Sequence, residues 1–251
     1  RKLDIPVLIG QGTTDSLFPL EQAMQLWQKG LTPAARRESI FVGYNGGHVL
    51  AATNPPGINV TSDPCSEELA GGDFEALTIR FFDEHLKGED TGLAGYGSYH
   101  LATPRSTCTD VTTVAPTRTR RISTIATRAT GDTPTYVKLA AGPISIAGTS
   151  YLTGLLTSPG PEGRAFYGLA MGRSRATAHL VQNNVLPLNE PRAVDGVRRR
   201  IDLPAVAVDV PAGQSLYLVA SPVSDTFTGI RSETEGAIRL DDVVVHLPVV
   251  R

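Results

Sequence analysis

The chain opens with a short apolar run that polar residues close. Ile5–Gly10 forms the run, Gln11–Thr14 is the polar stretch after it, and Asp15 follows directly. An apolar run of this length that ends in polar residues predicts a buried parallel strand. We expect this strand to deliver Asp15 at its carboxyl end.

A helix and a second strand are predicted next. Leu20–Lys29 has a helical pattern, and Pro19 stands where proline favours the start of a helix. A second apolar run, Ser39–Tyr44, predicts a strand that leads into the Gly-rich loop Asn45-Gly46-Gly47-His48. In open α/β sheets, the loops beyond the carboxyl ends of the strands are where ligands bind. The order strand, Asp15, helix, strand, His48 therefore marks these two residues as candidate site residues.

A further amphipathic helix is predicted between Asp73, as its N-terminal cap, and Gly88, as its end. Its apolar positions are Phe74, Leu77, Ile79, Phe81, Phe82 and Leu86. The stretches on either side, Val49–Gly72 and Leu93–Pro116, are rich in turn-forming residues and are predicted as loops. The second of them contains a short predicted strand, Tyr99–Ala102.

The pattern changes near residue 118, and no convincing helical period follows. Short runs rich in β-branched and aromatic residues are separated by turn signals. Val206, Val208 and Val210 alternate with Ala205, Ala207 and Asp209, as in a strand with one buried face. The predicted strands are Tyr136–Leu139, Ile144–Ile146, Ala165–Met171, Ala178–Val181, Val197–Leu203, Ala205–Val210, Ser215–Ala220 and Val243–Val249. This spacing predicts an antiparallel β-sandwich or jelly roll over residues 106–251, after an α/β region over residues 1–105.

An aspartate and a histidine on neighbouring strand ends suit nucleophilic catalysis. A serine hydroxyl needs a base within hydrogen-bond reach, and an imidazole base needs a carboxylate that fixes its tautomer and stabilises its protonated form. The glycines before His48 let the backbone turn sharply beside the ring. Taken singly, Asp15 is also explained as a turn or capping residue and His48 as polar surface. The ordered pair favours catalysis.

The order of acid, helix, strand and histidine resembles the last part of the catalytic domain of an α/β-hydrolase. Arg80–Gly88 is similar to the Phe-Phe-Asp-x-x-Leu-Lys-Gly ending of that domain in the cocaine esterase and X-prolyl dipeptidyl peptidase family. Val210–Gly213 and Leu240–Pro248 resemble a turn and the last strand of the jelly-roll domain that follows it in this family. The resemblance covers nearly the whole chain, with its two halves in the family's order.

The resemblance implies a serine hydrolase, either an esterase, an acylase or an X-prolyl peptidase. Its substrate would be a small ester, amide or peptide, and it would use no metal or organic cofactor. Asp15 would be the acid of the triad and His48 the general base. The jelly roll would shape one wall of the substrate cleft or aid assembly.

The nucleophile is missing from its expected place. In this family the serine precedes the acid, on a strand–turn–helix elbow. Only fourteen residues precede Asp15, and none is serine or cysteine. Gly172-Arg173-Ser174-Arg175-Ala176 fits a relaxed elbow pattern, but no helical pattern follows it, so we interpret the match as chance. We therefore expect the chain, which begins at Arg1, to be the C-terminal piece of a longer protein whose upstream half carries the nucleophile and the oxyanion hole.

Composition and charge indicate which kinds of binding partner the sequence gives reason to expect. The 251 residues are 41% hydrophobic and 19% charged, as in soluble globular proteins. A net charge of −2 gives no reason to expect a nucleic-acid or membrane partner, and the run Arg198–Arg200 is short enough to be a solvated strand face. No apolar run approaches the roughly 20 residues that cross a bilayer.

The two cysteines, Cys65 and Cys108, do not have the spacing of metal ligands. Both lie in polar, loop-like surroundings, so either they form one disulfide that ties the first region to the start of the second, or they are two unrelated thiols. We expect the disulfide, which would imply a secreted or extracytoplasmic protein.

A second class of function remains open. The sandwich is then a non-catalytic module that binds carbohydrate or protein, and the α/β part is its support. Aromatic residues make up only 6% of the chain, and the single tryptophan, Trp27, lies in the first region, which weighs against a sugar-stacking platform. A pseudoenzyme without its serine is a third interpretation.

Overall fold

The chain forms two compact units in the computed structural model, which describes residues 2–48, 54–227, 230 and 236–250. The first unit comprises Arg1–Val49 and Asn59–Val114, and the second Leu50–Ile58 and Ala115–Arg251. The first five residues of the predicted loop Val49–Gly72 lie outside the described residues.

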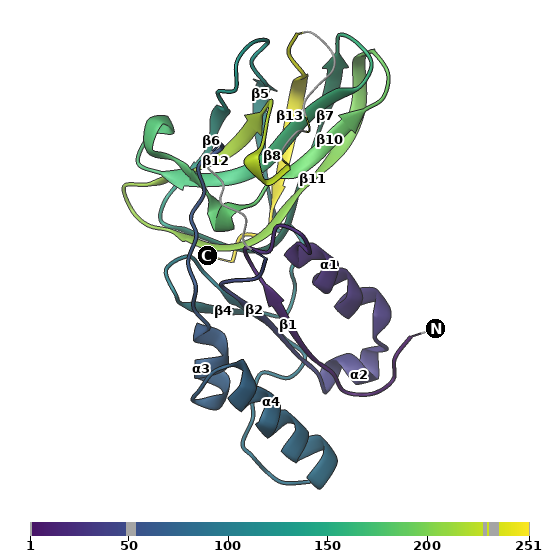
Figure 1. Cartoon of the computed structure of the whole chain (residues 1–251), viewed down its shortest axis with the longest axis vertical. Coiled ribbons are helices and arrows are strands. Elements are labelled where there is room, and N and C mark those ends of the chain that lie inside the picture. Colours follow the sequence, from purple (N-terminus) through teal and green to yellow (C-terminus); the bar gives the residue numbers. More distant parts are fainter. Residues whose placement is uncertain (1, 49–53, 228–229, 231–235, 251) are drawn as a thin grey trace. The chain divides into compact units, whose positions relative to one another are not determined.

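The first unit is built on a four-stranded sheet with the order β1-β2-β3-β4 (Figure 1). Strands β1 (Leu8–Gly12), β2 (Ile40–Tyr44) and β3 (Tyr99–Ala102) are parallel, and β4 (Cys108–Val111) is antiparallel to β3. The sequence predicts β2 and β3 correctly. The predicted strand at Ile5–Gly10 is displaced, since pairing with β2 begins only at Leu8.

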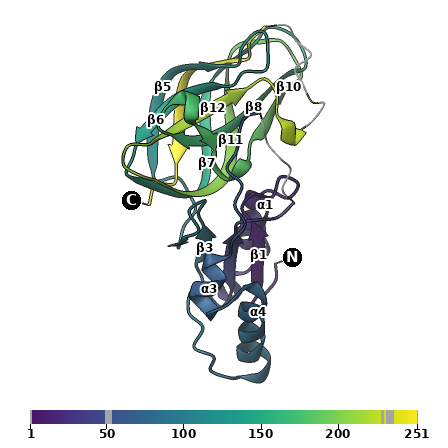
Figure 2. The same ribbon diagram turned by 60° about the vertical axis from the view of Figure 1, so that its left-hand side comes forward.

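Helices cover both faces of this sheet (Figures 1 and 2). On one face lie α1 (Leu20–Gln25), continued by a π-helical turn to Gly30, and α2 (Pro33–Arg37). Trp27 packs there against Phe41 and Tyr99, with ring centroids 5.8 and 5.5 Å away. On the other face lie α3 (Pro64–Ala70) and α4 (Phe74–Phe82). The core between these helices and the strands β2 and β3 consists of Ile40, Val42, Cys65, Ala70, Leu77, Phe81 and Ala102.

The predicted helix at residues 73–88 is confirmed with its caps. The Asp73 carboxylate accepts a hydrogen bond from the Ala76 N–H at 3.0 Å, and Gly88 ends the π-helical turn Asp83–Lys87 in a left-handed conformation. Helix α3 lies where a loop was predicted. It has an aspartate cap, Asp63, a proline at its first turn and Gly71 after its end, but it is too short to show an apolar period.

The second unit consists of two antiparallel sheets that share one core (Figure 2). One sheet has the order β10-β8-β12-β6, with β9 paired to β8, and the other has the order β11-β7-β13-β5. Leu152 and Val245 of the second sheet and Tyr167 and Leu218 of the first belong to the same buried cluster. The strands are β5 (Arg118–Ala126), β6 (Thr135–Ala141), β7 (Ile144–Ser158), β8 (Gly163–Gly172), β9 (His179–Leu180), β10 (Leu186–Glu190), β11 (Val194–Val210), β12 (Ser215–Ser221) and β13 (Arg239–Leu247).

The predicted β pattern is largely confirmed, with differences at its joints. Two predicted strands, Val197–Leu203 and Ala205–Val210, form the single strand β11. The pairing register with β7 shifts between Leu203 and Val206, so Pro204 lies at an irregularity, where a missing N–H is tolerated. Strands β5 and β10 were not predicted as separate strands.

Residues 54–58 belong to the second unit, although the first unit includes the chain up to Val49 and again from Asn59. The Ile58 N–H donates to the Leu180 carbonyl at 3.0 Å, and the Leu180 N–H donates to the Pro56 carbonyl. Asn54 is held through its backbone N–H, which donates to the Asp225 carboxylate at 2.8 Å. This short segment therefore adds to the edge of the sandwich beside β9.

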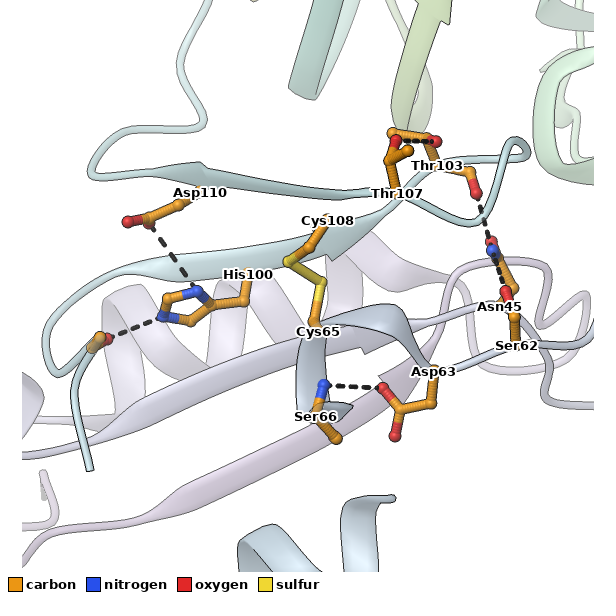
Figure 3. Close-up of a disulfide and its surroundings, with 11 residues drawn as sticks. Asn45, Ser62, Asp63, Cys65, Ser66, His100, Thr103, Thr107, Cys108 and Asp110 are labelled. Atoms are coloured by element: carbon orange, nitrogen blue, oxygen red, sulfur yellow. Dashed lines mark hydrogen bonds and ion pairs between the residues drawn. A yellow bond between two sulfur atoms is a disulfide. The ribbon is translucent and has the colours of Figure 1, made fainter. Parts of the chain in front are cut away.

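The predicted disulfide is confirmed between Cys65 of α3 and Cys108 of β4 (Figure 3). The sequence predicts a bridge that ties the first region to the start of the second. Instead, both cysteines lie in the first unit. The bridge joins the helical layer to the last strand of the sheet. Among the described residues, no helix is long and apolar enough to span a membrane.

Candidate active site at the ends of β1 and β2

The parallel pairing of β1 and β2 places the loops that follow them side by side. Gly12 is in register with Tyr44, the last residues of the two strands. Beyond the sheet, the Thr13 N–H donates to the Tyr44 carbonyl at 2.7 Å, and the Thr14 hydroxyl donates to the Gly46 carbonyl at 2.9 Å. The two loops are thus bonded to each other before they reach Asp15 and His48.

The structure brings the two predicted site residues together. His48 Nδ1 lies 3.0 Å from Asp15 Oδ2. The Asp15 side chain is 6% exposed, whereas the His48 side chain is 61% exposed. A carboxylate at Nδ1 fixes a neutral histidine with its proton on that nitrogen, so the lone pair lies on Nε2. The pair therefore presents an oriented base on the surface of this unit.

The second oxygen of Asp15 is held by backbone. Oδ1 accepts hydrogen bonds from the N–H groups of Leu17 and Phe18, both at 2.9 Å. Burial acts to raise the pKa of Asp15, but the hydrogen bonds from Phe18, His48 and Leu17 outweigh it, so the pKa lies below its ordinary value. The carboxyl group is therefore charged at neutral pH, the state that orients an imidazole.

Gly47 makes the close approach of the loops sterically feasible. It has φ of +111°, and a Cβ atom on it would lie 2.6 Å from Asp15 Cβ. Any side chain would displace the carboxyl group from His48. The same reason explains Gly12, where a Cβ atom would lie 2.2 Å from the Gly46 carbonyl oxygen.

Two apolar side chains lie exposed beside the histidine. Leu17 is 55% and Phe18 56% exposed, although the hydrogen bonds to Asp15 fix the backbone of both. The Phe18 ring lies 5.6 Å from the His48 ring in an edge-on arrangement. Exposed apolar residues on a fixed backbone are suited to contact a ligand or another part of a protein.

Asn45 is a residue of this site that the sequence analysis missed. It is 1% exposed, and its side chain accepts a hydrogen bond from the Thr13 hydroxyl at 3.0 Å. It donates to the Ser62 hydroxyl at 2.9 Å and the Thr103 carbonyl at 2.7 Å (Figure 3). Asn45 thereby ties the His48 loop to β1 and to the chain after β3. Its position directly after β2 is the one available sequence signal.

Ser174, the serine of the relaxed elbow pattern, belongs to a local turn. Ser174 caps the 3₁₀ turn Arg175–Thr177, with its hydroxyl 3.1 Å from that of Thr177, and no α-helix follows it. The elbow context is therefore absent there, as the sequence indicated. Within the described part of the chain, no group of three or more His, Cys, Asp or Glu side chains is placed to hold a metal ion.

Comparison by sequence finds no match, either to a protein-family model or to a curated protein. Comparison by structure finds solved hydrolases. A CocE/NonD family hydrolase from Staphylococcus aureus (SACOL2612) superposes with a TM-score of 0.65 at 10% identity, over 99% of this chain and 55% of that one. An α-amino acid ester hydrolase matches with a TM-score of 0.59 at 9% identity, over 98% of this chain and 56% of that one.

An aminopeptidase from a marine sediment archaeon, Thaumarchaeota archaeon, gives a TM-score of 0.66 at 10% identity, over 100% of this chain and 56% of that one. The chain thus spans little more than half the length of each of these three proteins. At such identities the likeness concerns the fold. The chain has the fold of the C-terminal part of the CocE/NonD family hydrolases.

Proposed function

We propose that this chain is the acid-and-base part of a serine hydrolase that cleaves ester or amide bonds by acyl transfer. The observation that carries the proposal is the hydrogen bond between His48 Nδ1 and the buried Asp15 carboxylate, with the imidazole exposed. His48 Nε2 would take the proton of a serine hydroxyl and later give it to the leaving group. Asp15 would hold the imidazole and stabilise its protonated form.

The serine would come from an upstream part of the same protein. Among the described residues, β1 pairs only with β2, so one edge of this apolar strand has no neighbour. Ile5, just before it, is 61% exposed, and Leu17 and Phe18 lie uncovered at its other end. A parallel strand added to β1 would cover these residues, and its carboxyl end would reach the same edge of the sheet as His48.

The fold likeness supports the same assignment. The solved proteins with this fold include an ester hydrolase and an aminopeptidase, and esters and peptide amides are the class of bond that this pair would serve. We extend the proposal to an α/β-hydrolase fragment followed by a jelly-roll domain. We also assign the protein to an oxidising, extracytoplasmic compartment, because the Cys65–Cys108 disulfide is stable there. An X-prolyl peptide is one substrate within this class.

The test begins with the intact mass of the natural product, followed by labelling with a fluorophosphonate serine probe. We expect a longer or two-piece protein that is labelled upstream of residue 1. His48→Ala should abolish labelling without changing the circular dichroism spectrum. His179→Ala, which removes an exposed histidine of the second unit, is the matched control and should label normally. If the natural product is this chain alone and takes no label, the proposal fails and a non-catalytic binding role leads.

A further inference from the structure

The sheet β11-β7-β13-β5 carries a depression whose lining includes neither Asp15 nor His48. Its volume is about 690 Å³, in the range of pockets that hold a drug-sized ligand. The lining comes from β5, β13 and β11, and its polar side chains are Arg121, Ser123, Arg198 and Asp242. All four residues are exposed, so a ligand would reach them without rearrangement of the core.

Two arginines of the depression lack the carboxylate partners that neighbouring arginines have. Arg200 lies 3.0 Å from Asp202, Arg239 2.8 Å from Asp241, and Arg199 2.9 Å from Glu190. Over the described part of the chain, Arg121 and Arg198 form no such ion pair. Guanidinium groups bind carboxylate, phosphate or sulfate oxygens bidentately, so this pair is available to an anionic ligand.

The strand order sets the spacing of the two charges. Arg198 lies on β11 and Arg121 on β5, the outermost strands of a four-stranded sheet. Three inter-strand spacings of 4.7–4.9 Å separate their backbones by about 14 Å across the sheet, and the two are farther apart in total because Arg121 lies three residues along β5 from Thr124, the residue level with Arg198. A single inorganic anion would leave most of the depression empty. An extended ligand with more than one anionic group fits both the volume and the spacing.

Asp242 restricts the ligand further. This residue stands between the two arginines in the sheet, with φ of 49°, in the left-handed region that non-glycine residues seldom occupy. Its carboxylate accepts hydrogen bonds from hydroxyl groups, as does Ser123, and it repels an anionic group placed directly beside it. The combination favours a ligand that carries hydroxyl groups between its anionic groups.

The Tyr151 ring on β7 of this sheet has no free face for stacking. The Arg200 guanidinium lies 3.7 Å from the centroid of this ring, and the His246 ring stacks on it at 4.1 Å and 13°. Two groups this close to one ring must occupy its opposite faces. A ligand that relies on stacking, such as a nucleobase or a neutral sugar, therefore gains nothing from Tyr151.

We propose that this depression binds a carboxylated oligosaccharide. Arg121 and Arg198 would bind the carboxylates of separate sugar units, and Asp242 and Ser123 would bind hydroxyls between them. This binding site is independent of Asp15 and His48, because all four of its polar residues lie in the second unit. It gives the sandwich a binding role that does not depend on aromatic side chains.

The test is calorimetric titration of the 251-residue chain with oligogalacturonate at low salt. We expect binding that weakens at least about tenfold in Arg121→Gln and in Arg198→Gln, since each loses a charge-assisted bidentate contact. Arg120→Gln is the matched control, because Arg120 is exposed on the same strand but does not line the depression, and it should bind as the unmodified chain does. All three changes are at the surface, and circular dichroism checks the fold of each variant.

Two further ligands distinguish the contribution of the carboxylates to binding from that of the hydroxyl groups. Methyl-esterified oligogalacturonate keeps every hydroxyl and loses the charge, and we expect it not to bind. Oligoaspartate keeps the carboxylates and loses the hydroxyls, and we expect markedly weaker binding. The proposal is overturned by an absence of binding to oligogalacturonate, by equal binding of either comparison ligand, or by equal affinity of the two arginine variants and the Arg120→Gln control.

Discussion

Gly47 lies in the His48 loop where that loop approaches Asp15. Because glycine has no side chain, there is room at this point for the Asp15 carboxyl group. The contact between Asp15 and His48 therefore depends on the absence of a Cβ atom at Gly47 as well as on the polar groups themselves. The same holds for Gly12, which faces the Gly46 carbonyl. Substitutions at these positions should act on the hydrogen bond between Asp15 and His48 without touching either residue.

Gly47→Ala should therefore destabilise the chain and separate Asp15 from His48. The left-handed φ costs an alanine roughly 1 kcal/mol, and the overlap with Asp15 Cβ adds to it. Gly88→Ala is the matched control, since Gly88 also has a left-handed φ but nothing lies within 4 Å of its added Cβ. Urea unfolding gives the free energies, and the imidazole NMR signals of His48 report the contact. Equal losses in the two variants would contradict the steric explanation.

Acid should remove the stability that Asp15 contributes. Its pKa is lowered in the folded state, so the contribution is present above the unfolded value of about 3.9 and is lost as the pH falls through the lower folded value. We expect the free energy of unfolding of the unmodified chain to exceed that of Asp15→Asn at pH 5, and the gap to shrink by pH 2.5. Urea titrations of both proteins at the two pH values measure it. A gap that widens in acid would reverse the sign of the assigned pKa shift.

The pairing of Asp15 with His48 could be predicted from sequence because each lies in the loop that follows a recognisable apolar strand. Asn45 could not be assigned a role in the same way. Its partners, Thr13, Ser62 and Thr103, lie 32, 17 and 58 residues away, and only the folded sheet brings them together. The unequal surroundings of Asp15 and Phe18, one buried and one exposed, are likewise set by tertiary packing.

Among the elements, α3 and β4 show what local pattern cannot reveal. Each is short, and each is held by a partner far along the chain, including the bond between Cys65 and Cys108. Helix α4 was predictable because its nine residues and both caps carry a local signal. The joining of two predicted strands into β11 was not, because proline at residue 204 is a breaker by sequence and is accommodated only by an irregularity in pairing with β7.

Removal of the disulfide should lower the stability of the first unit. The bridge closes a loop with a sequence separation of 43 residues, for which chain-entropy arguments give about 4 kcal/mol, and measured values are typically 2–4 kcal/mol. The double variant Cys65→Ala, Cys108→Ala keeps an apolar side chain at buried Cys65. Trp27, the single tryptophan and 1% exposed in this unit, gives the fluorescence signal for urea unfolding. An unchanged midpoint after the substitution or after reduction would contradict the prediction.

For the whole molecule, separate cores in the two units predict separate unfolding transitions. Trp27 fluorescence follows the first unit, and the NMR signals of the His246 imidazole on β13 follow the second. We expect the two signals to give different midpoints in urea, and reduction of the disulfide to shift only the fluorescence midpoint. Coincident midpoints that move together on reduction would show one cooperative unit.

The α/β region followed by an antiparallel β region could be predicted because the apolar period changes near residue 118. The order of strands within each sheet could not, because the neighbours β12 and β6, or β11 and β7, are far apart in sequence. We predicted a boundary at residue 105. Strand β4 lies beyond that residue, but it pairs with β3 and so belongs to the first unit. Composition along the chain does not reveal this pairing.

Residues 54–58 have a practical consequence for dissecting the protein. Because this segment completes the edge of the sandwich while the first unit includes chain both before and after it, no single cut in the chain yields both units intact. A recombinant fragment that starts at Ala115 would expose the Leu180 backbone and leave Asp225 without Asn54. Expression of the sandwich alone therefore calls for a circularly permuted or co-expressed design that restores those five residues, and failed fragments should not be taken as evidence against its independence.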